Sequence, residues 1–143
     1  MGPRAGRAAR QPRRVILVDS SAWIEFLRDT GSPACVRVDE LLYDEIATCH
    51  PVRMEMLAGA RDEAQLQSLR GLLARASVLP TAPADYEDAA ALYRTCRRRD
   101  DTVRRLIDCL IAAHAIRARI PLLHADADFD VLARHTDLLI DGA

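Results

Sequence analysis

The sequence contains no lysine. All 20 basic side chains in its 143 residues are arginine, so any mechanism that needs a catalytic lysine is excluded. Phosphoacceptor domains of the receiver and haloacid-dehalogenase-like types also cluster aspartates at the ends of parallel strands, but they rely on a lysine beside them. The absence of lysine therefore argues against that class of protein.

Cysteine pairs with metal-ligand spacing are also absent. Cys35, Cys49, Cys96 and Cys109 form no CxxC pair, and each falls inside an apolar segment. No secretion signal is recognisable. This usage is typical of reduced, buried thiols in a cytoplasmic protein, and not of a disulfide framework or a zinc site.

Two further scarcities argue against a membrane-spanning protein and against an extensive base-stacking surface. No uncharged run exceeds nine residues, which is too short to span a membrane, so we expect a soluble protein. Aromatic residues make up only 4% of the chain, which argues against an extensive platform for stacking nucleic-acid bases.

The net charge of −1 hides an asymmetry. Residues 1–14 carry five arginines and no acid, so residues 15–143 have a net charge of −6. We expect residues 1–14 to form a basic, flexible tail; a frayed terminus, a misplaced start and a nucleic-acid-binding arm all explain it. Residues 15–143 have the length of one compact domain.

Short apolar strands alternate with helical patterns along the chain. This alternation predicts parallel βαβ units, and hence an α/β fold: a three-layer α/β/α sandwich around a parallel sheet of about four to five strands. Ser32 and Asp62 are expected to cap helices. The expected strands are 15–18, 46–48, 77–80, 121–125 and 138–140, and the expected helices cover 19–29, 32–42, 51–59, 62–76, 83–98 and 103–117.

Four acids have unusual positions in this pattern. Asp19 ends the strand "VILV", and Asp126 stands one residue beyond "PLLHA"; sites in open parallel sheets form at the carboxyl ends of strands. Glu55 and Asp108 interrupt the apolar helical segments "MEMLAG" and "LIDCLIAA". Acids are seldom buried unless they are paired or bind a metal.

Each acid also has an ordinary structural explanation. Asp19 could cap a helix, Glu55 could pair with Arg53 or Arg61, and Asp108 could favour a helix N-terminus. Asp126, like Asp128 and Asp130, could be a helix cap or a solvated first-turn residue. Together, however, four adjacent carboxylates would repel one another, and a divalent cation would remove that cost. Oxygen ligands without a His or Cys cluster favour Mg²⁺, with Mn²⁺ as a substitute, and suit hydrolysis of a phosphodiester.

Four segments resemble a known family in order and spacing. They are "VDSSAW" (18–23), "PVRMEMLAGA" (51–60), "VRRLIDCLIAA" (103–113) and "PLLHADADFDVLA" (121–133), and they resemble PIN-domain ribonucleases of the VapC toxin type. The resemblance implies a magnesium-dependent endoribonuclease, the toxin of a type II toxin–antitoxin pair, held inactive by a VapB-type antitoxin.

The resemblance assigns roles to the acids. Asp19 and Asp108 are expected to ligate the principal metal, while Glu55 and Asp126 complete the cage, orienting water or holding a second ion. Ser21 matches a hydroxyl position that lines such sites, although a helix cap explains it equally well.

The neighbouring acids are separated from that set. Asp128 is expected either in an outer shell of the site or as a cap of a last helix that continues through "VLARH", and Asp130 as an ordinary first-turn acid of that helix.

The sequence leaves alternatives open for the surfaces that would bind a substrate or a partner. A basic stretch that includes Arg98, Arg99, Arg104 and Arg105 is consistent with an RNA-binding edge and equally with a solvated helix face. The apolar cluster of Trp23, Ile24, Phe26 and Leu27 fits core packing, an antitoxin groove or a homodimer seam. The alternative function is a catalytically silent RNA- or protein-binding module on the same fold.

Overall fold

The computed structural model describes residues 15–42 and 45–142, so the expectation for residues 1–14 lies outside the described part of the chain. Elements follow one another in the alternating order that the sequence predicts. They are β1 (Ile16–Val18), α2 (Ser20–Leu27), α3 (Pro33–Leu41), β2 (Ile46–Cys49), α4 (His50–Ala58), α5 (Glu63–Leu73), β3 (Ser77–Leu79), α6 (Pro83–Arg98), α7 (Leu106–Ala118), β4 (Leu122–Leu123) and α8 (Ala127–His135).

The sheet is parallel, with four strands in the order β3-β2-β1-β4. Strand β1 pairs with β4 through Leu17 opposite Leu122, so the two strands that lead to Asp19 and Asp126 are neighbours. The stretch 138–140 forms only an isolated parallel bridge, between Ile140 and Leu122, so the fifth expected strand is not formed.

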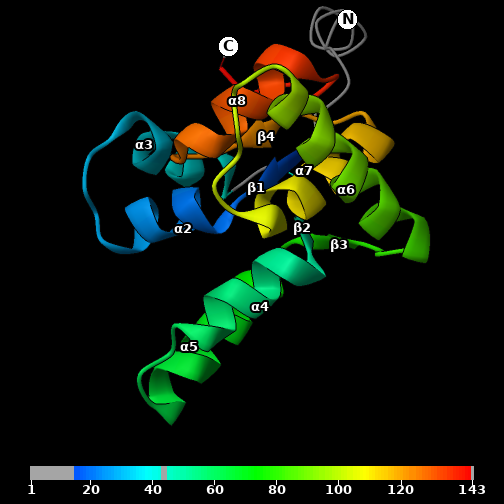
Figure 1. Ribbon diagram of the computed structural model, residues 1–143. Coiled ribbons are helices and arrows are strands. Elements are labelled where there is room, and N and C mark those ends of the chain that lie inside the picture. Colours follow the sequence, from blue (N-terminus) through cyan, green and yellow to red (C-terminus); the bar gives the residue numbers. More distant parts are fainter. Residues whose placement is uncertain (1–14, 43–44, 143) are drawn as a thin grey trace, which may run out of the picture.

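Helices cover both faces of the sheet, and the α/β/α sandwich predicted from the sequence is confirmed (Figure 1). Helices α2 and α3 pack against each other on one side, and α6 and α7 pack together on the other. Helices α4 and α5 form a hairpin that projects from the body of the molecule (Figure 1). None of the helices among the described residues is long and apolar enough to cross a membrane.

Side-chain caps start several of these helices. The side chains of Asp19, Ser32 and Asp62 accept backbone N–H groups at the starts of α2, α3 and α5, as their sequence positions predict. Helix α7 begins at Leu106, three residues later than expected. The N–H groups of the two residues before it are taken by a side chain from α8, which holds that segment in a non-helical path.

The core lies between the sheet and its helices. Among its largest fully buried side chains are Trp23, Phe129, Leu17 and Ile111. Trp23 therefore belongs to the core and is removed from the proposed apolar surface of the first helix. The four cysteines are buried free thiols, as predicted.

Shortening a side chain of the central strand should destabilise the fold. Leu17→Ala leaves a cavity at a position with no exposed surface and is expected to lower the free energy of unfolding by about 2–5 kcal/mol. Val36→Ala, on the exposed side of α3, is the control and should change it by less than about 0.5 kcal/mol. Urea denaturation of both variants measures the difference; equal effects would contradict the central place of β1.

Candidate active site

Two strand ends bring the first acids together. Asp19 follows β1, and its backbone N–H donates to the Leu123 carbonyl at the end of β4, at 2.9 Å. The Ser21 hydroxyl donates to Asp19 Oδ2 and accepts the N–H of Ala125, at 2.9 Å. Asp19 is thus the cap of α2, whereas Ser21 ties the Asp19 loop to the segment that precedes Asp126.

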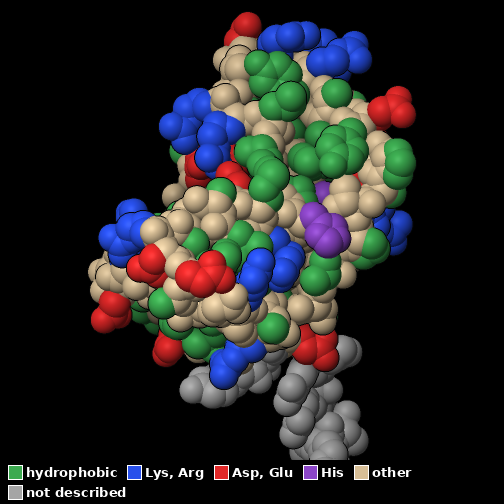
Figure 2. Space-filling view, turned by 90° about the horizontal axis from the view of Figure 1, so that it is seen from below, with side chains coloured by type: hydrophobic (Ala, Val, Ile, Leu, Met, Phe, Trp, Pro, Cys, Tyr) green, Lys and Arg blue, Asp and Glu red, His purple; other side chains and the backbone are tan. Residues whose placement is uncertain are grey.

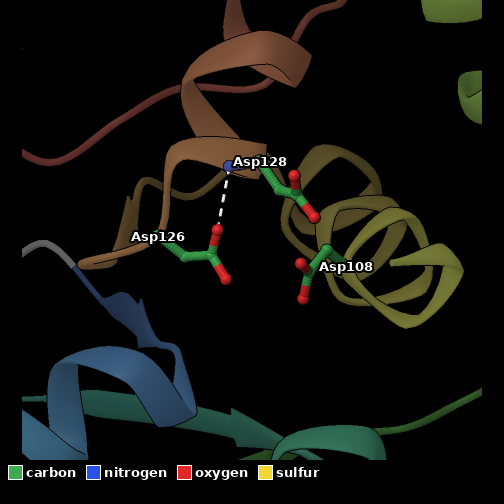
Figure 3. A group of neighbouring side chains, drawn as sticks. All are labelled: Asp108, Asp126 and Asp128. Atoms are coloured by element: carbon green, nitrogen blue, oxygen red, sulfur yellow. Dashed lines mark hydrogen bonds between the residues drawn. The ribbon is translucent and has the colours of Figure 1, made fainter. Parts of the chain in front are cut away.

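Three carboxylates converge beside that junction. One oxygen from each of Asp108, Asp126 and Asp128 lies within 4.8 Å of the others, and Figure 3 shows them pointing toward a common space from α7 and from the start of α8. Asp126 caps α8 by accepting the N–H of Asp128 at 2.9 Å. Of the two roles expected for Asp128, the cap of α8 is therefore wrong, since Asp126 occupies that position.

Asp128 instead fixes the approach to α7. Its carboxylate accepts the backbone N–H groups of Arg104 and Arg105, at 3.1 and 3.0 Å, and it is almost fully buried. Because one of its oxygens also belongs to the three-carboxylate group, Asp128 links the backbone ahead of α7 to the acidic cluster. Asp128, which the sequence analysis separated from the four acids of the site, is thus part of the acidic cluster.

Glu55 reaches the same region from α4. It accepts a hydrogen bond from the Ser20 hydroxyl at 2.9 Å and lies 3.3 Å from Arg105 Nη2. Surface pairing with Arg53 or Arg61, the ordinary explanation, is not what the structure has. The sequence did not predict a role for Ser20. The signal available in the sequence was that two serines, Ser20 and Ser21, follow Asp19 at the start of a helix.

The basic stretch divides into two parts. Arg104 contacts Asp126 at 2.9 Å and Asp128 at 3.2 Å, and Arg105 contacts Asp108 at 3.0 Å. Arg98 and Arg99 are exposed near the end of α6, and no ion pair joins them to an acid among the described residues. Within this stretch, Arg104 and Arg105 are therefore the two arginines that contact the acidic cluster.

Burial controls the ionisation of the acids. Burial raises the pKa of Asp19, and the hydrogen bonds from Ser21 only partly offset this effect. Burial also raises the pKa of Asp108 to about 7, opposed by Arg105 and supported by a hydrogen bond shared with Asp128. Burial alone would raise the pKa of Asp128, but its hydrogen bonds from Asp108 and from the backbone ahead of α7 hold that pKa below its usual range.

The donor set fits a hard divalent cation. The three clustered acids offer only carboxylate oxygens, the ligands that Mg²⁺ and Mn²⁺ prefer. Beside them, Asp19 Oδ1 is buried and makes no hydrogen bond within the described residues. Such an atom is costly unless a further partner satisfies it. Asp108, Asp126 and Asp128 are therefore the nearest candidates for a cage, with Asp19 and Glu55 beside it.

Carboxylates that converge at the carboxyl edge of a parallel sheet, with arginines at their margin, are suited to metal-assisted hydrolysis of phosphodiesters. The family comparison agrees with this class, because the PIN domain model matches residues 16–135. The chain belongs to the PIN-domain family.

Its curated relatives are ribonucleases by name. The chain is 48% identical over 128 residues to Ribonuclease VapC11 of Mycobacterium tuberculosis, and equally to VapC ribonuclease Mb1587 of Mycobacterium bovis. Each alignment covers 87% of this chain and 96% of the relative. The resemblance to VapC proteins predicted from the four segments is thus confirmed.

Solved structures agree on the fold. A chain of VapBC-1 from nontypeable Haemophilus influenzae matches with a TM-score of 0.70 at 19% identity, covering 89% of this chain and 96% of that one. A chain of VapBC2 from Rickettsia felis matches with a TM-score of 0.69 at 19% identity, covering 89% and 97%. At this identity, the likeness concerns the fold alone.

The raised pKa of Asp108 predicts a pH dependence of stability. At pH values between the usual aspartate pKa of 3.8 and the raised pKa of about 7, the folded state holds a proton that the unfolded state has released. The free energy of unfolding should therefore fall as pH rises through this window. The loss approaches about 1.4 kcal/mol for each unit by which the pKa is raised. Asp108→Asn removes this contribution and should flatten the decline.

Urea denaturation with EDTA, at about pH 5 and about pH 8, measures this effect. Asp88→Asn, which makes the same chemical change at an exposed position on α6, should keep the decline of the wild type. An equal decline in Asp108→Asn would contradict the assignment.

Proposed function

We propose that the protein is a metal-dependent endoribonuclease and the toxin of a type II toxin–antitoxin pair. The observation that carries the proposal is the convergence of Asp108, Asp126 and Asp128, with Asp19 and Glu55 beside them, at the carboxyl edge of the sheet. The family match and the names of the VapC relatives support ribonuclease chemistry. Mg²⁺ is the proposed cation, with Mn²⁺ as a substitute.

The proposed catalytic set comprises Asp19, Glu55, Asp108 and Asp126, with Asp128 and Ser21 as supporting residues. When bound, a divalent cation supplies charge neutralisation at the phosphodiester and a water of lowered pKa. Asp108 and Asp126 of the three-carboxylate group, together with Asp19, would hold it. Asp128, whose carboxylate already accepts the backbone N–H groups ahead of α7, would support them. Glu55, fixed by Ser20, would orient the attacking water from the side of α4.

Arginines supply the remaining contacts to substrate. Arg104 has a side chain that is 70% exposed although it contacts Asp126 and Asp128, so it can reach a phosphate at the rim of the acidic site. Arg105, Arg98 and Arg99 would extend this edge. In Figure 2, basic and acidic side chains are interspersed around one face and no large area of one sign appears, which favours local phosphate contacts over a broad basic groove.

An antitoxin of the VapB type is the proposed regulator, since the fold neighbours come from VapBC structures. Ile24 and Leu27 of α2 are 38% and 49% exposed, and with Met56 and Leu69 they line a pocket of about 400 Å³ that also includes Glu55. An amphipathic peptide seated there would lie next to the acids.

A homodimer is the proposed assembly. A second pocket of about 260 Å³ has an apolar lining contributed by α6 and α7, in which Tyr86 and Leu106 are exposed, and such a patch suits a seam between two copies. We further propose that residues 15–143 act as one nuclease domain, that residues 1–14 are a basic tail, and that the enzyme meets its RNA in the cytoplasm.

Loss of one clustered carboxylate should abolish cleavage. The antitoxin-free protein is incubated with total cellular RNA in Mg²⁺ or in EDTA, and new 5′ ends are mapped. Asp108→Asn is expected to lower cleavage by more than about a hundredfold, because even residues outside a metal's ligand shell cost about 10–100-fold. Asp130→Asn, at an exposed position of α8, is the matched control and should cleave as the wild type does.

The outcomes separate the two candidate functions. Metal-dependent ends at one recurring sequence support the nuclease. Cleavage that persists unaltered in Asp108→Asn would refute the metal site, and absence of cleavage by the wild type would favour the silent binding module.

Arg104 should contribute to RNA affinity without setting sequence preference. In the Asp108→Asn background, which prevents cleavage, Arg104→Gln is expected to weaken binding to different RNAs by a similar factor. It should also reduce the slope of log K against log salt by about 0.7, the value for one phosphate contact on a single strand. Fluorescence anisotropy over a salt series measures both. Arg119→Gln, at the opposite end of α7, should leave the slope unchanged; an unchanged slope for Arg104→Gln would sink the assignment.

A further inference from the structure

We infer that Arg105 is a built-in counter-ion of the acidic site that competes with the divalent cation for the same carboxylates. The inference rests on the proposed function, because it concerns the same site, and it adds a residue that sets how tightly the cation binds. One side-chain nitrogen of Arg105 contacts acids from three elements.

That nitrogen, Arg105 Nη2, lies among three carboxylates from three elements. It is 3.0 Å from Asp108 Oδ1 on α7, 3.3 Å from Glu55 Oε2 on α4 and 3.9 Å from Asp126 Oδ2 at the start of α8. Arg105 Nε adds a second contact to Asp108, at 3.4 Å. A single positive group therefore contacts three of the four acids proposed for catalysis.

Arg104 provides the contrast. Its guanidinium contacts Asp126 and Asp128 but neither Asp108 nor Glu55, and its side chain is 70% exposed, against 48% for Arg105. Arg104 thus lies at the rim, whereas Arg105 reaches between the elements that carry the acids. Among the described residues, Arg105 is the arginine that contacts both Asp108 and Glu55.

The backbone of Arg105 is anchored independently of its side chain. The residue is the N-cap of α7, and its N–H donates to Asp128 Oδ2 at 3.0 Å. A half-exposed side chain on an anchored backbone can leave the carboxylates for solvent without moving α7. Removal of the guanidinium from the site therefore requires rotation about side-chain bonds only.

The two occupants exclude each other for electrostatic reasons. A carboxylate oxygen that donates its electron pairs to a divalent cation cannot keep a guanidinium at hydrogen-bond distance from the same pairs, and the two positive charges repel. Arginine stays protonated at all physiological pH values, and Asp108, Glu55 and Asp126 raise its pKa further. Its positive charge therefore always opposes the incoming cation, and the cation must displace it.

This arrangement has two opposite effects that a purely structural ion pair would not have. Without cation, Arg105 relieves the repulsion among the acids and stabilises the fold. With cation, the same contacts must be broken, so they lower the affinity. Once displaced, the guanidinium lies at the edge of the site, where it can form an ion pair with an RNA phosphate.

The test measures cation binding directly, without RNA. Metal-free full-length protein is titrated with Mn²⁺ by calorimetry, as wild type, Arg105→Gln, Arg105→Lys and Arg119→Gln. Arg105→Gln is expected to lower the Kd for Mn²⁺ by about tenfold or more, the equivalent of one charge-assisted hydrogen bond. In EDTA the same variant should melt at a lower temperature. Arg119→Gln makes the same charge change on an exposed residue and should match the wild type in both measurements.

If Arg105→Gln does not fold, Arg105→Lys, which keeps the positive charge, can still be measured. Its Kd for Mn²⁺ should stay within about threefold of the wild-type value, which is less than the tenfold change expected for Arg105→Gln. Equal or weaker Mn²⁺ binding by Arg105→Gln, or a tenfold gain in Arg105→Lys, would overturn the inference while leaving the nuclease proposal intact. If no variant bound Mn²⁺, the proposed function itself would fail.

Discussion

Repulsion among carboxylates is the constraint on which the rest of this structure depends. Asp19, Glu55, Asp108, Asp126 and Asp128 come from four helices or helix starts and meet at one edge of the sheet. Burial and mutual proximity both penalise the charged forms. The raised pKa of Asp108, to about 7, shows how much of that penalty the protein leaves uncompensated.

Different groups stabilise the different carboxylates of the site. Serine hydroxyls hold Asp19 and Glu55, backbone N–H groups hold Asp128, and two adjacent arginines carry the only positive charge in contact with the described acids of the site. The late start of α7 also helps to stabilise these acids, since it leaves the N–H groups of Arg104 and Arg105 free to donate to Asp128. The position at which α7 begins therefore affects the stabilisation of charge in the site.

Much of the architecture was predictable from local patterns. The strands β1, β2 and β3, the caps Ser32 and Asp62 and the break at Gly59 follow from residue type and spacing within a few positions of the chain. The adjacency of β1 and β4, which brings Asp19 and Asp126 to the same edge, was not predicted and comes from the strand order of the folded sheet. Where the prediction failed, at the fifth strand and at the first turn of α7, the outcome depended on contacts with distant segments.

The sequence by itself determined that this is a parallel α/β domain with acids at the ends of its strands, because hydrophobic periodicity and capping act over a few neighbouring residues. Tertiary structure alone decided which further side chains join the four acids that the sequence had placed in one site. Ser20 meets Glu55 across 35 positions, and Arg104 meets Asp128 across 24. No local pattern encodes such pairs, since they exist only after the crossovers have brought α4, α7 and α8 to one edge of the sheet.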